Sequence, residues 1–295
     1  MKREDVSQRD EPLARQLDEV RKLMAGCVAE TPLQKPLADC SNLFGNGKML
    51  RARLVLRLGP ATGASYSTLL RAASAVELIH AASLLHDDVI DGGFLRRGAP
   101  TFWVERGIPA AILTGDLLLF KAFELIMPVD DGELVQPLIR LTGEVVEAET
   151  EQELVVRATP SDWETCVRIA RRKTGPLFAF AARAAARDDE QLRATLTEAG
   201  YRIGTAYQLS DDILDVNGDT ASAGKTLGLD AAREKSTAAR VEVPATVDSV
   251  GYVRTLCEES SALLADWPAV QDAWNTYMLH DFRPALDRNL GLIPA

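Results

Sequence analysis

Two acidic motifs of the same form, each set in an apolar helical stretch, constrain this chain more than any other feature. The first, DDVID at 87–91, ends the apolar run 68–91, and the second, DDILD at 211–215, lies in the run 190–215. Helical residues four apart share a face and lie about 6 Å apart along the axis. Because carboxylates this close repel one another, an apolar helix would not hold them without a cation. The motifs therefore predict two helices that contribute to one metal site.

Gln208 extends the second motif into a polar stripe. Positions 208, 211, 212 and 215 follow the i, i+3, i+4, i+7 spacing that is apolar in an ordinary core helix. Neighbouring Ile203 and Leu209 are apolar, so the stripe indicates a functional cavity on an otherwise buried helix. Magnesium is the expected metal, because it prefers oxygen ligands and binds through a few carboxylates together with phosphates. The chain has three histidines and no Cys/His cluster suited to zinc.

The hydrophobic pattern is helical along nearly the whole chain. Helices are expected at 12–30, 68–91, 110–127, 133–157, 161–172, 176–187, 190–215, 251–266 and 268–290. The best strand candidate is 241–250, although Pro244 interrupts it, and 217–235 is the most loop-like interior segment. The sequence thus predicts one all-α domain spanning 1–295, a bundle of about ten helices that can hold a central cavity.

Charge and composition exclude several classes of protein. The net charge is -10 and the pI is about 5.0, whereas nucleic-acid binders are usually basic. No apolar stretch approaches the roughly 20 residues of a membrane span, and the charged N-terminus lacks the apolar core of a signal peptide. The four cysteines are widely spaced, which is typical of free thiols. We therefore expect a cytoplasmic protein without a transmembrane segment and without a nucleic-acid partner.

Basic residues gather near the acidic motifs, although the chain as a whole is acidic. Basic side chains and helix N-termini both suit phosphate groups. A glycine-bearing turn at 45–51 opens a helix and carries two of these residues, and the others follow or precede the motifs. The candidate phosphate ligands are Lys48, Arg51, Arg96, Arg97, Lys173, Lys225 and Lys235.

Two long segments carry a resemblance to a known family. ELIHAASLLHDDVIDGGFLRRGAPT and YQLSDDILDV are similar to motifs of the trans-isoprenyl diphosphate synthases, the polyprenyl synthase family, and the resemblance runs from about 45 to 235. It implies an isoprenoid-synthase-type bundle around a deep central cavity, usually a homodimer. It also implies a prenyltransferase that condenses isopentenyl diphosphate with an allylic diphosphate, using about three magnesium ions bound together with the substrate diphosphate.

The resemblance assigns roles to individual residues of this chain. The magnesium ligands would be Asp87, Asp88, Asp91, Asp211, Asp212 and Asp215. The allylic diphosphate would contact Arg96, Lys173, Lys225 and Lys235. Isopentenyl diphosphate would bind Lys48, Arg51, His80 and Arg97. Thr174 and Gln208 would lie beside the developing carbocation. The reaction needs no protein nucleophile, because metal ions and basic groups stabilise the leaving diphosphate.

Residues just before the first motif bear on product length. In this family the positions four and five before the motif form a floor of the product channel, and aromatic residues there stop elongation early. Here these residues are Ser83 and Ala82, which are small, with Ile79 and then Val76 one and two turns further on. The sequence therefore favours a product of geranylgeranyl length or longer.

One departure from the family pattern leaves alternatives open. Where the family usually reads G-K-R-L-R-P, this chain has GKMLRA at 47–52, so Met49 and Ala52 replace an arginine and a proline. This change keeps a non-catalytic or partner-dependent subunit of a heteromer as an alternative. A class I terpene cyclase is a further alternative, although its second metal motif is typically of Asn/Ser/Glu type.

Overall fold

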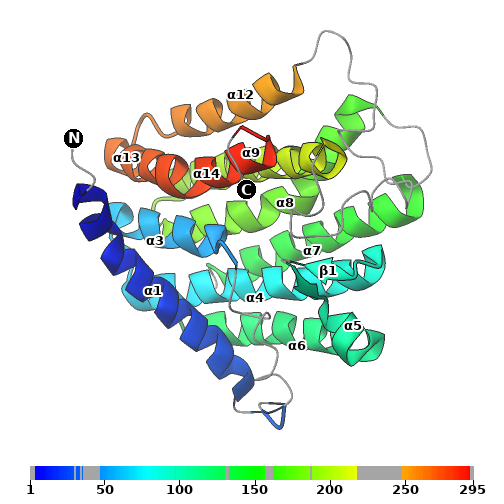
Figure 1. The fold of residues 1–295 in the computed structure, drawn as a ribbon. Coiled ribbons are helices and arrows are strands. Elements are labelled where there is room, and N and C mark those ends of the chain that lie inside the picture. The colour runs from blue at the N-terminus through cyan, green and yellow to red at the C-terminus, as the bar shows by residue number, and fades with distance from the viewer. Residues whose placement is uncertain are drawn as a thin grey trace.

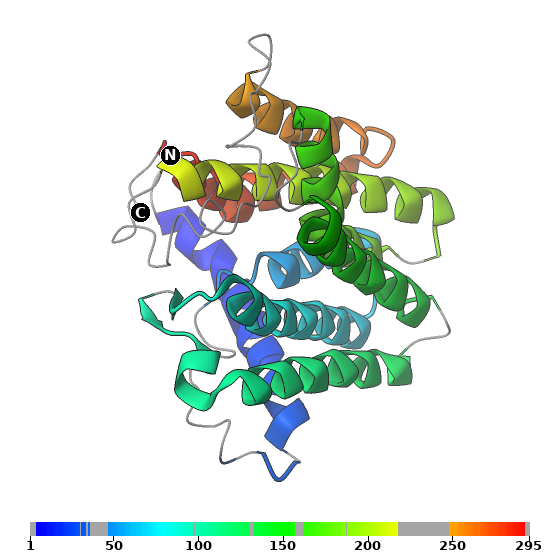
Figure 2. The same cartoon turned by 90° about the vertical axis from the view of Figure 1, so that its right-hand side faces the viewer.

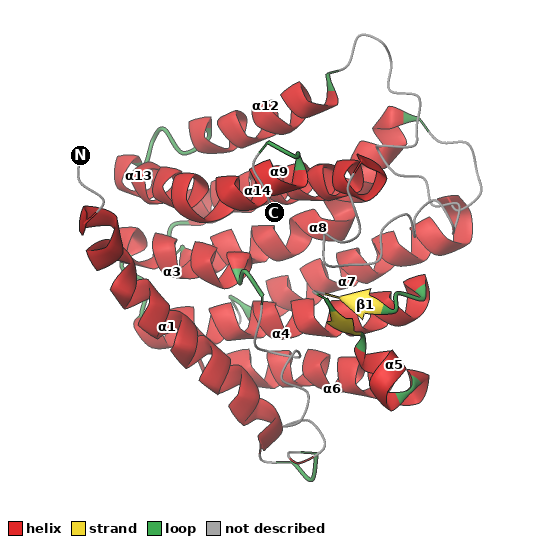
Figure 3. Cartoon of the chain, viewed as in Figure 1, coloured by secondary structure: helices red, strands yellow, loops and turns green. Residues whose placement is uncertain are grey.

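The computed structural model describes residues 4–29, 31–33, 35, 47–96, 98–129, 133–156, 162–186, 188–217 and 248–292, with no side chains described for 4–11 and 215–217. The α-helices are α1 Glu4–Ala29, α3 Leu50–Thr62, α4 Tyr66–Asp91, α5 Phe102–Arg106, α6 Ile108–Ile126, α7 Val135–Glu151, α8 Trp163–Ala185, α9 Glu190–Asn217, α12 Ser249–Ala262, α13 Pro268–Tyr277 and α14 Arg283–Asn289. Within these ranges the strands are β1 Leu95–Arg96 and β2 Ala99–Pro100, which form a small antiparallel hairpin (Figure 3). The expectation of an all-α fold is confirmed.

Three short turns of other helical types complete the description. A 3-10 turn, η1 Met127–Val129, follows α6, and a π-helical turn, η2 Gln152–Val156, continues α7. A second π turn, η3 Met278–Phe282, joins α13 to α14. Sequence periodicity predicted the helical run 268–290 but not the π turn inside it.

Helix α4 runs through the middle of the bundle. In two perpendicular views it lies between α6 on one side and α3 and α8 on the other, with α1 crossing obliquely (Figures 1 and 2). Residues from Ala72 to Ile79 are all buried. Among the described helices, α4 alone is long and apolar enough to cross a membrane, yet 67% of its most apolar window is buried inside the fold. We therefore regard α4 as a core helix.

Helices α8 and α9 pack with their backbones in direct contact. A Cβ atom on Gly204 would lie 2.6 Å from the Cα of Gly175, and a Cβ on Gly200 would lie 2.5 Å from the Cα of Ala179. No side chain fits at either position, so glycine is required for this close approach. The close packing of α8 and α9 brings residues of the two helices within hydrogen-bonding distance further along.

The prediction of separate helices at 161–172 and 176–187 is wrong, because α8 continues through Pro176. Proline inside a helix removes a hydrogen bond and costs about 3 kcal/mol. Residues 174–182 are all buried in the core, and fully burying one large apolar side chain contributes about 1.5–3 kcal/mol. Tertiary packing therefore outweighs the local preference for a break.

Two other expectations concern segments that the structure describes only in part. Ser249 and Val250 belong to α12, so the strand proposed at 241–250 is wrong at its end, and 241–247 lies outside the described residues. The loop expected at 217–235 also lies outside, apart from Asn217 at the end of α9. The short helix α5 and the β hairpin were not predicted, because each is too short to show a period.

Gly204→Ala should disrupt the packing of α8 against α9. The added methyl must displace the Gly175 backbone, so we expect the free energy of unfolding to fall by about 1–3 kcal/mol. Gly143→Ala in α7 is the matched control, because a Cβ there meets nothing within 4 Å, and it should raise stability by about 0.5–1 kcal/mol. Urea denaturation measures both. Equal effects of the two substitutions would contradict this account.

Candidate active site

The first acidic motif ends α4, and the hairpin returns the chain to it. Gly92 terminates the helix in the left-handed conformation with φ 64°. In the hairpin that follows, Arg96 turns back and its Nε donates to both oxygens of Asp88 at 2.9 and 3.1 Å. The hydroxyl of Thr101 and the indole of Trp103 both donate to the Gly93 carbonyl. The turn therefore holds Arg96 against the motif.

Helices α7 and α8 place a second cation beside the same motif. Lys173 Nζ lies 2.7 Å from Glu149 Oε1 and donates to Gln152 Oε1 at 3.4 Å. Burial and the charge of Glu149 raise the pKa of Asp87 to about 7, against the opposing effect of Lys173. Burial alone would lower the pKa of Lys173, but Glu149 and Asp87 outweigh it and raise that pKa. The site thus concentrates negative charge that favours a bound cation.

The second motif is joined to α8 by a chain of hydrogen bonds. The hydroxyl of Thr174 donates to Gln208 Oε1, and Gln208 Nε2 donates to Asp212 Oδ1 at 2.8 Å. Burial would lower the pKa of Arg96, but Asp88 together with Asp87 and Asp211 raises it. Carboxylates from both motifs therefore act on the same guanidinium, which supports the prediction that the two motifs share one site.

The donor set of this site fits magnesium. Its carboxylate and amide side chains offer oxygen ligands, which magnesium prefers, and burial together with the charge of Glu149 raises the pKa of Asp87. Within the described part of the chain, no three His, Cys, Asp or Glu side chains come close enough to hold a metal ion by themselves.

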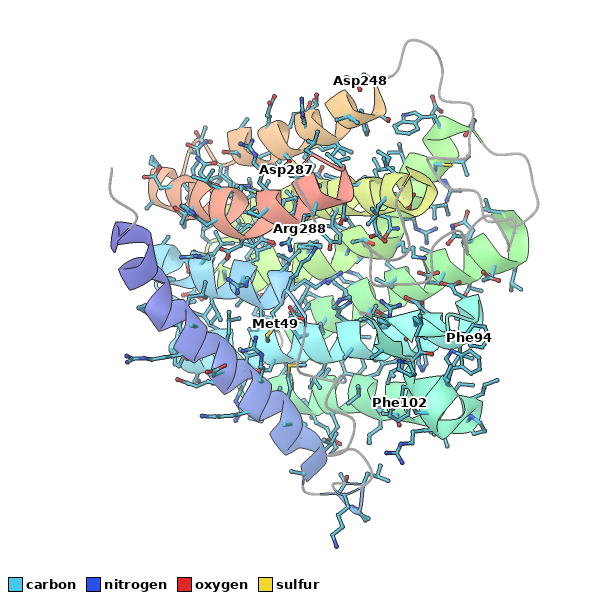
Figure 4. The ribbon with its side chains drawn as sticks, in the orientation of Figure 1. Met49, Phe94, Phe102, Asp248, Asp287 and Arg288 are labelled. Carbon is cyan, nitrogen blue, oxygen red and sulfur yellow. The ribbon has the colours of Figure 1, made fainter. Side chains whose placement is uncertain are left out.

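The turn before α3 carries the expected residues in an unusual conformation. Met49 adopts the left-handed region at φ 49° and ψ 44°, which costs about 1–3 kcal/mol for a residue with a side chain. Figure 4 shows Met49 at the start of α3, away from Phe94 beyond the end of α4. Lys48 is exposed, and His80 on α4 is half-buried. The replacement of arginine by methionine thus falls on a strained backbone position.

Arg51 is buried rather than presented at a surface. Its guanidinium carbon lies 4.7 Å from the centre of the Phe178 ring, and Nε has no hydrogen-bond partner. Burial lowers the pKa of Arg51, against the opposing charge of Glu77. Glu77 also accepts a hydrogen bond from the Ala52 amide at 3.0 Å. The role of Arg51 as a diphosphate ligand therefore stays a prediction.

Several predicted site residues lie outside the part of the chain that the structure describes. Arg97, Lys225, Lys235 and the side chain of Asp215 are among them. The residues proposed for product length lie on α4 just before the first motif, where Val76, Ile79 and Ala82 are buried and Ser83 is half-buried. Their roles also stay predictions.

Two findings beside the motif were not predicted. Glu149 and Gln152 lie three residues apart, so both face Lys173, and this spacing was the available signal. His86 packs against α6, where its Nε2 lies 3.1 Å from the Ile112 carbonyl oxygen. A Cβ on Gly115 would lie 2.2 Å from that nitrogen, so this glycine makes room for the ring.

Comparisons with known proteins agree with the site. A family model described as polyprenyl synthetase matches residues 33–249. An octaprenyl diphosphate synthase from Haemophilus influenzae is 31% identical over 243 residues, covering 80% of this chain and 74% of that protein. A farnesyl diphosphate synthase from Escherichia coli is 38% identical over 234 residues, covering 71% and 76%.

Solved structures show the same fold. A polyprenyl synthase from Caulobacter crescentus, crystallised with calcium and isoprenyl diphosphate, superimposes with a TM-score of 0.72 at 27% identity, covering 95% of this chain and 94% of that one. These matches mean that the chain belongs to the polyprenyl synthetase family and is a chain-elongating trans-prenyltransferase.

Proposed function

We propose that this enzyme joins isopentenyl diphosphate to an allylic diphosphate and releases a longer trans-prenyl diphosphate. The observation that carries the proposal is that carboxylates of both acidic motifs act on Arg96, with Lys173 beside the first motif. Such a set of carboxylates and basic groups suits a diphosphate bound through metal ions. The Caulobacter relative with its calcium and isoprenyl diphosphate supports the same assignment.

Magnesium would be held by the aspartates of the two motifs, including Asp215. When bound, it would supply positive charge that stabilises the leaving diphosphate. A cluster of about three ions, shared with the substrate oxygens, accords with the lack of a complete protein-only metal site among the described residues.

The basic residues bind and orient the two substrates. Arg96 and Lys173, with Lys225 and Lys235, would hold the allylic diphosphate, and Thr174 and Gln208 would direct their oxygens toward the positive charge that develops as it leaves. Lys48, Arg51, His80 and Arg97 would orient isopentenyl diphosphate. Apolar side chains keep water from the cation, and no nucleophilic side chain is required.

The small residues Ser83 and Ala82 support a product of geranylgeranyl length or longer. The named relatives do not choose a length, because they include farnesyl, geranylgeranyl and octaprenyl diphosphate synthases. Ser83 is half-buried, and its hydroxyl donates to the His80 carbonyl.

A homodimer is proposed from an exposed apolar face. Leu113, Phe120 and Met127 are 63–68% exposed and lie seven residues apart, on one face of α6 and its end. On neighbouring α7, Ile139 and Val146 repeat this spacing and are 50% and 55% exposed. Exposed large apolar side chains repeated in this way are typical of a protein interface. We place the enzyme in the cytoplasm.

The reaction is tested by incubating the protein with magnesium, isopentenyl diphosphate and each of four allylic primers, from dimethylallyl to geranylgeranyl diphosphate. Mass spectrometry sizes the dephosphorylated products. We expect elongation that falls by at least about 100-fold in Asp87→Ala and Asp211→Ala, because each removes a metal ligand. Asp272→Ala, at an exposed carboxylate on α13, is the control. No condensation by the wild type would favour a partner-dependent subunit, and cyclised hydrocarbon without isopentenyl consumption would favour a cyclase.

Ser83→Phe should shorten the main product by at least one isoprene unit, because the ring would fill the space below the first motif. Ser83→Ala is the control and should leave the length unchanged. The product distribution at a fixed primer concentration measures the effect. The same distribution in wild type and Ser83→Phe would contradict the assignment of the floor.

Leu113→Glu combined with Phe120→Glu should convert the dimer into a monomer, because charges would be buried in the proposed interface. Leu292→Glu, at another exposed apolar residue, is the control. Sedimentation velocity measures the mass. A wild-type monomer at micromolar concentration would contradict the dimer.

A further inference from the structure

A buried carboxylate in the C-terminal π turn binds two arginines of α3. Asp281 Oδ1 lies 2.7 Å from Arg53 Nη1, and its Oδ2 lies 2.9 Å from Arg57 Nε. The Asp281 side chain is only 2% exposed. Residues more than 220 positions apart in the sequence are thereby joined by charge-assisted hydrogen bonds.

Arg53 links Asp281 to the turn before α3. Its Nε donates to the Lys48 carbonyl at 2.9 Å while its Nη1 holds Asp281. Lys48 directly precedes Met49, the residue in the left-handed conformation. A strained backbone conformation persists only where its surroundings fix it. The Arg53 side chain binds this turn through the Lys48 carbonyl.

The same π turn also reaches the Arg51 side of the turn. The ring of Phe282 packs 5.9 Å from the ring of Phe178 and 5.9 Å from that of Tyr207. Phe178 in turn lies under the Arg51 guanidinium. Turn η3 therefore contacts Arg53, which binds the Lys48 carbonyl, and Phe178, which packs against Arg51. π-helical turns are often found at functional sites.

Stability alone is a poor explanation for this arrangement. Replacing a buried ion pair by apolar side chains is often neutral or stabilising, and α3 and α13 already pack through apolar side chains such as Leu54 and Trp274. The ion pair instead fixes an orientation. Asp281 holds the Arg53 side chain, and Arg53 holds the Lys48 carbonyl.

We infer that Asp281 is a positioning residue for the isopentenyl diphosphate site. Through Arg53 it holds the Lys48 carbonyl and so fixes the 47–51 turn, which carries the proposed isopentenyl diphosphate ligands Lys48 and Arg51. The inference rests on the proposed function, since it is that function which assigns these residues to isopentenyl diphosphate. Of the allylic-site residues that the structure describes, Arg96 is held by Asp88 and Lys173 by Glu149, and neither contact involves Asp281.

Three variants test the inference by steady-state kinetics with each substrate varied in turn. Asp281→Asn removes the charge that Arg53 needs, and Arg53→Gln removes the bond to the Lys48 carbonyl. Each should raise KM for isopentenyl diphosphate roughly tenfold, the loss expected from one hydrogen bond of ordinary net strength, while KM for the allylic substrate changes less than about twofold. Arg57→Gln is the matched control, because Arg57 binds the same carboxylate through Nε and lies one turn further from Lys48, and it should leave both KM values unchanged.

A second measurement does not depend on the reaction. Amide hydrogen exchange of residues 47–53, without substrate, should speed up in Asp281→Asn and Arg53→Gln but not in Arg57→Gln. Equal rises in both KM values, an effect as large in Arg57→Gln, or unchanged exchange would overturn the inference. A wild type that condenses nothing overturns the proposed function instead, and the exchange rates then decide whether Asp281 positions the turn.

Discussion

The backbone contact between α8 and α9 is the constraint on which the site depends. Gly175 and Gly204 let the two helices approach until only Cα hydrogens separate them. One turn from this contact, Thr174 and Gln208 then meet, and Gln208 in turn binds Asp212. Lys173 on the same stretch of α8 faces the first motif through Glu149. If the two helices lay further apart, the groups proposed to bind the metal cations and the groups proposed to bind the diphosphate would both be displaced.

The two halves of the site are held by different contacts. The allylic half relies on the close packing of α8 against α9, which tolerates little displacement, and on the ion pairs of Arg96 with Asp88 and of Lys173 with Glu149. The turn before α3 relies on ion pairs from Asp281 through Arg53, and on an aromatic cluster around Arg51. Directional charge contacts suit a turn whose backbone is strained at Met49, since packing alone does not fix a carbonyl direction.

Much of the fold and the centre of the site could be predicted from the sequence. The apolar period predicted most of the helices. The two acidic motifs include Asp87, Asp88 and Asp211, whose charges act on Arg96, and their roles as metal ligands stay predictions. The continuous α8 could not be predicted, because local rules favour a break at Pro176 and only tertiary burial overrides it. Asp281 was missed because a single carboxylate carries no pattern, and the i, i+3 spacing of Glu149 and Gln152 was a weak signal because it recurs on many helix surfaces. The burial of Arg51 could not be foreseen either, because its cage is built from Phe178 and Glu77 on other helices.

The pairing of Arg96 with Asp88, and of Lys173 with Glu149, has a thermodynamic consequence. Without ligands these side chains serve as each other's counter-ions. An anion that recruits the two cations leaves the carboxylates uncompensated, and a divalent ion that recruits the carboxylates frees the cations. Coupling between two ligands is reciprocal, so each should tighten the binding of the other by the same factor. A chain of net charge -10 would then admit a multiply charged anion only as part of a nearly neutral ion complex.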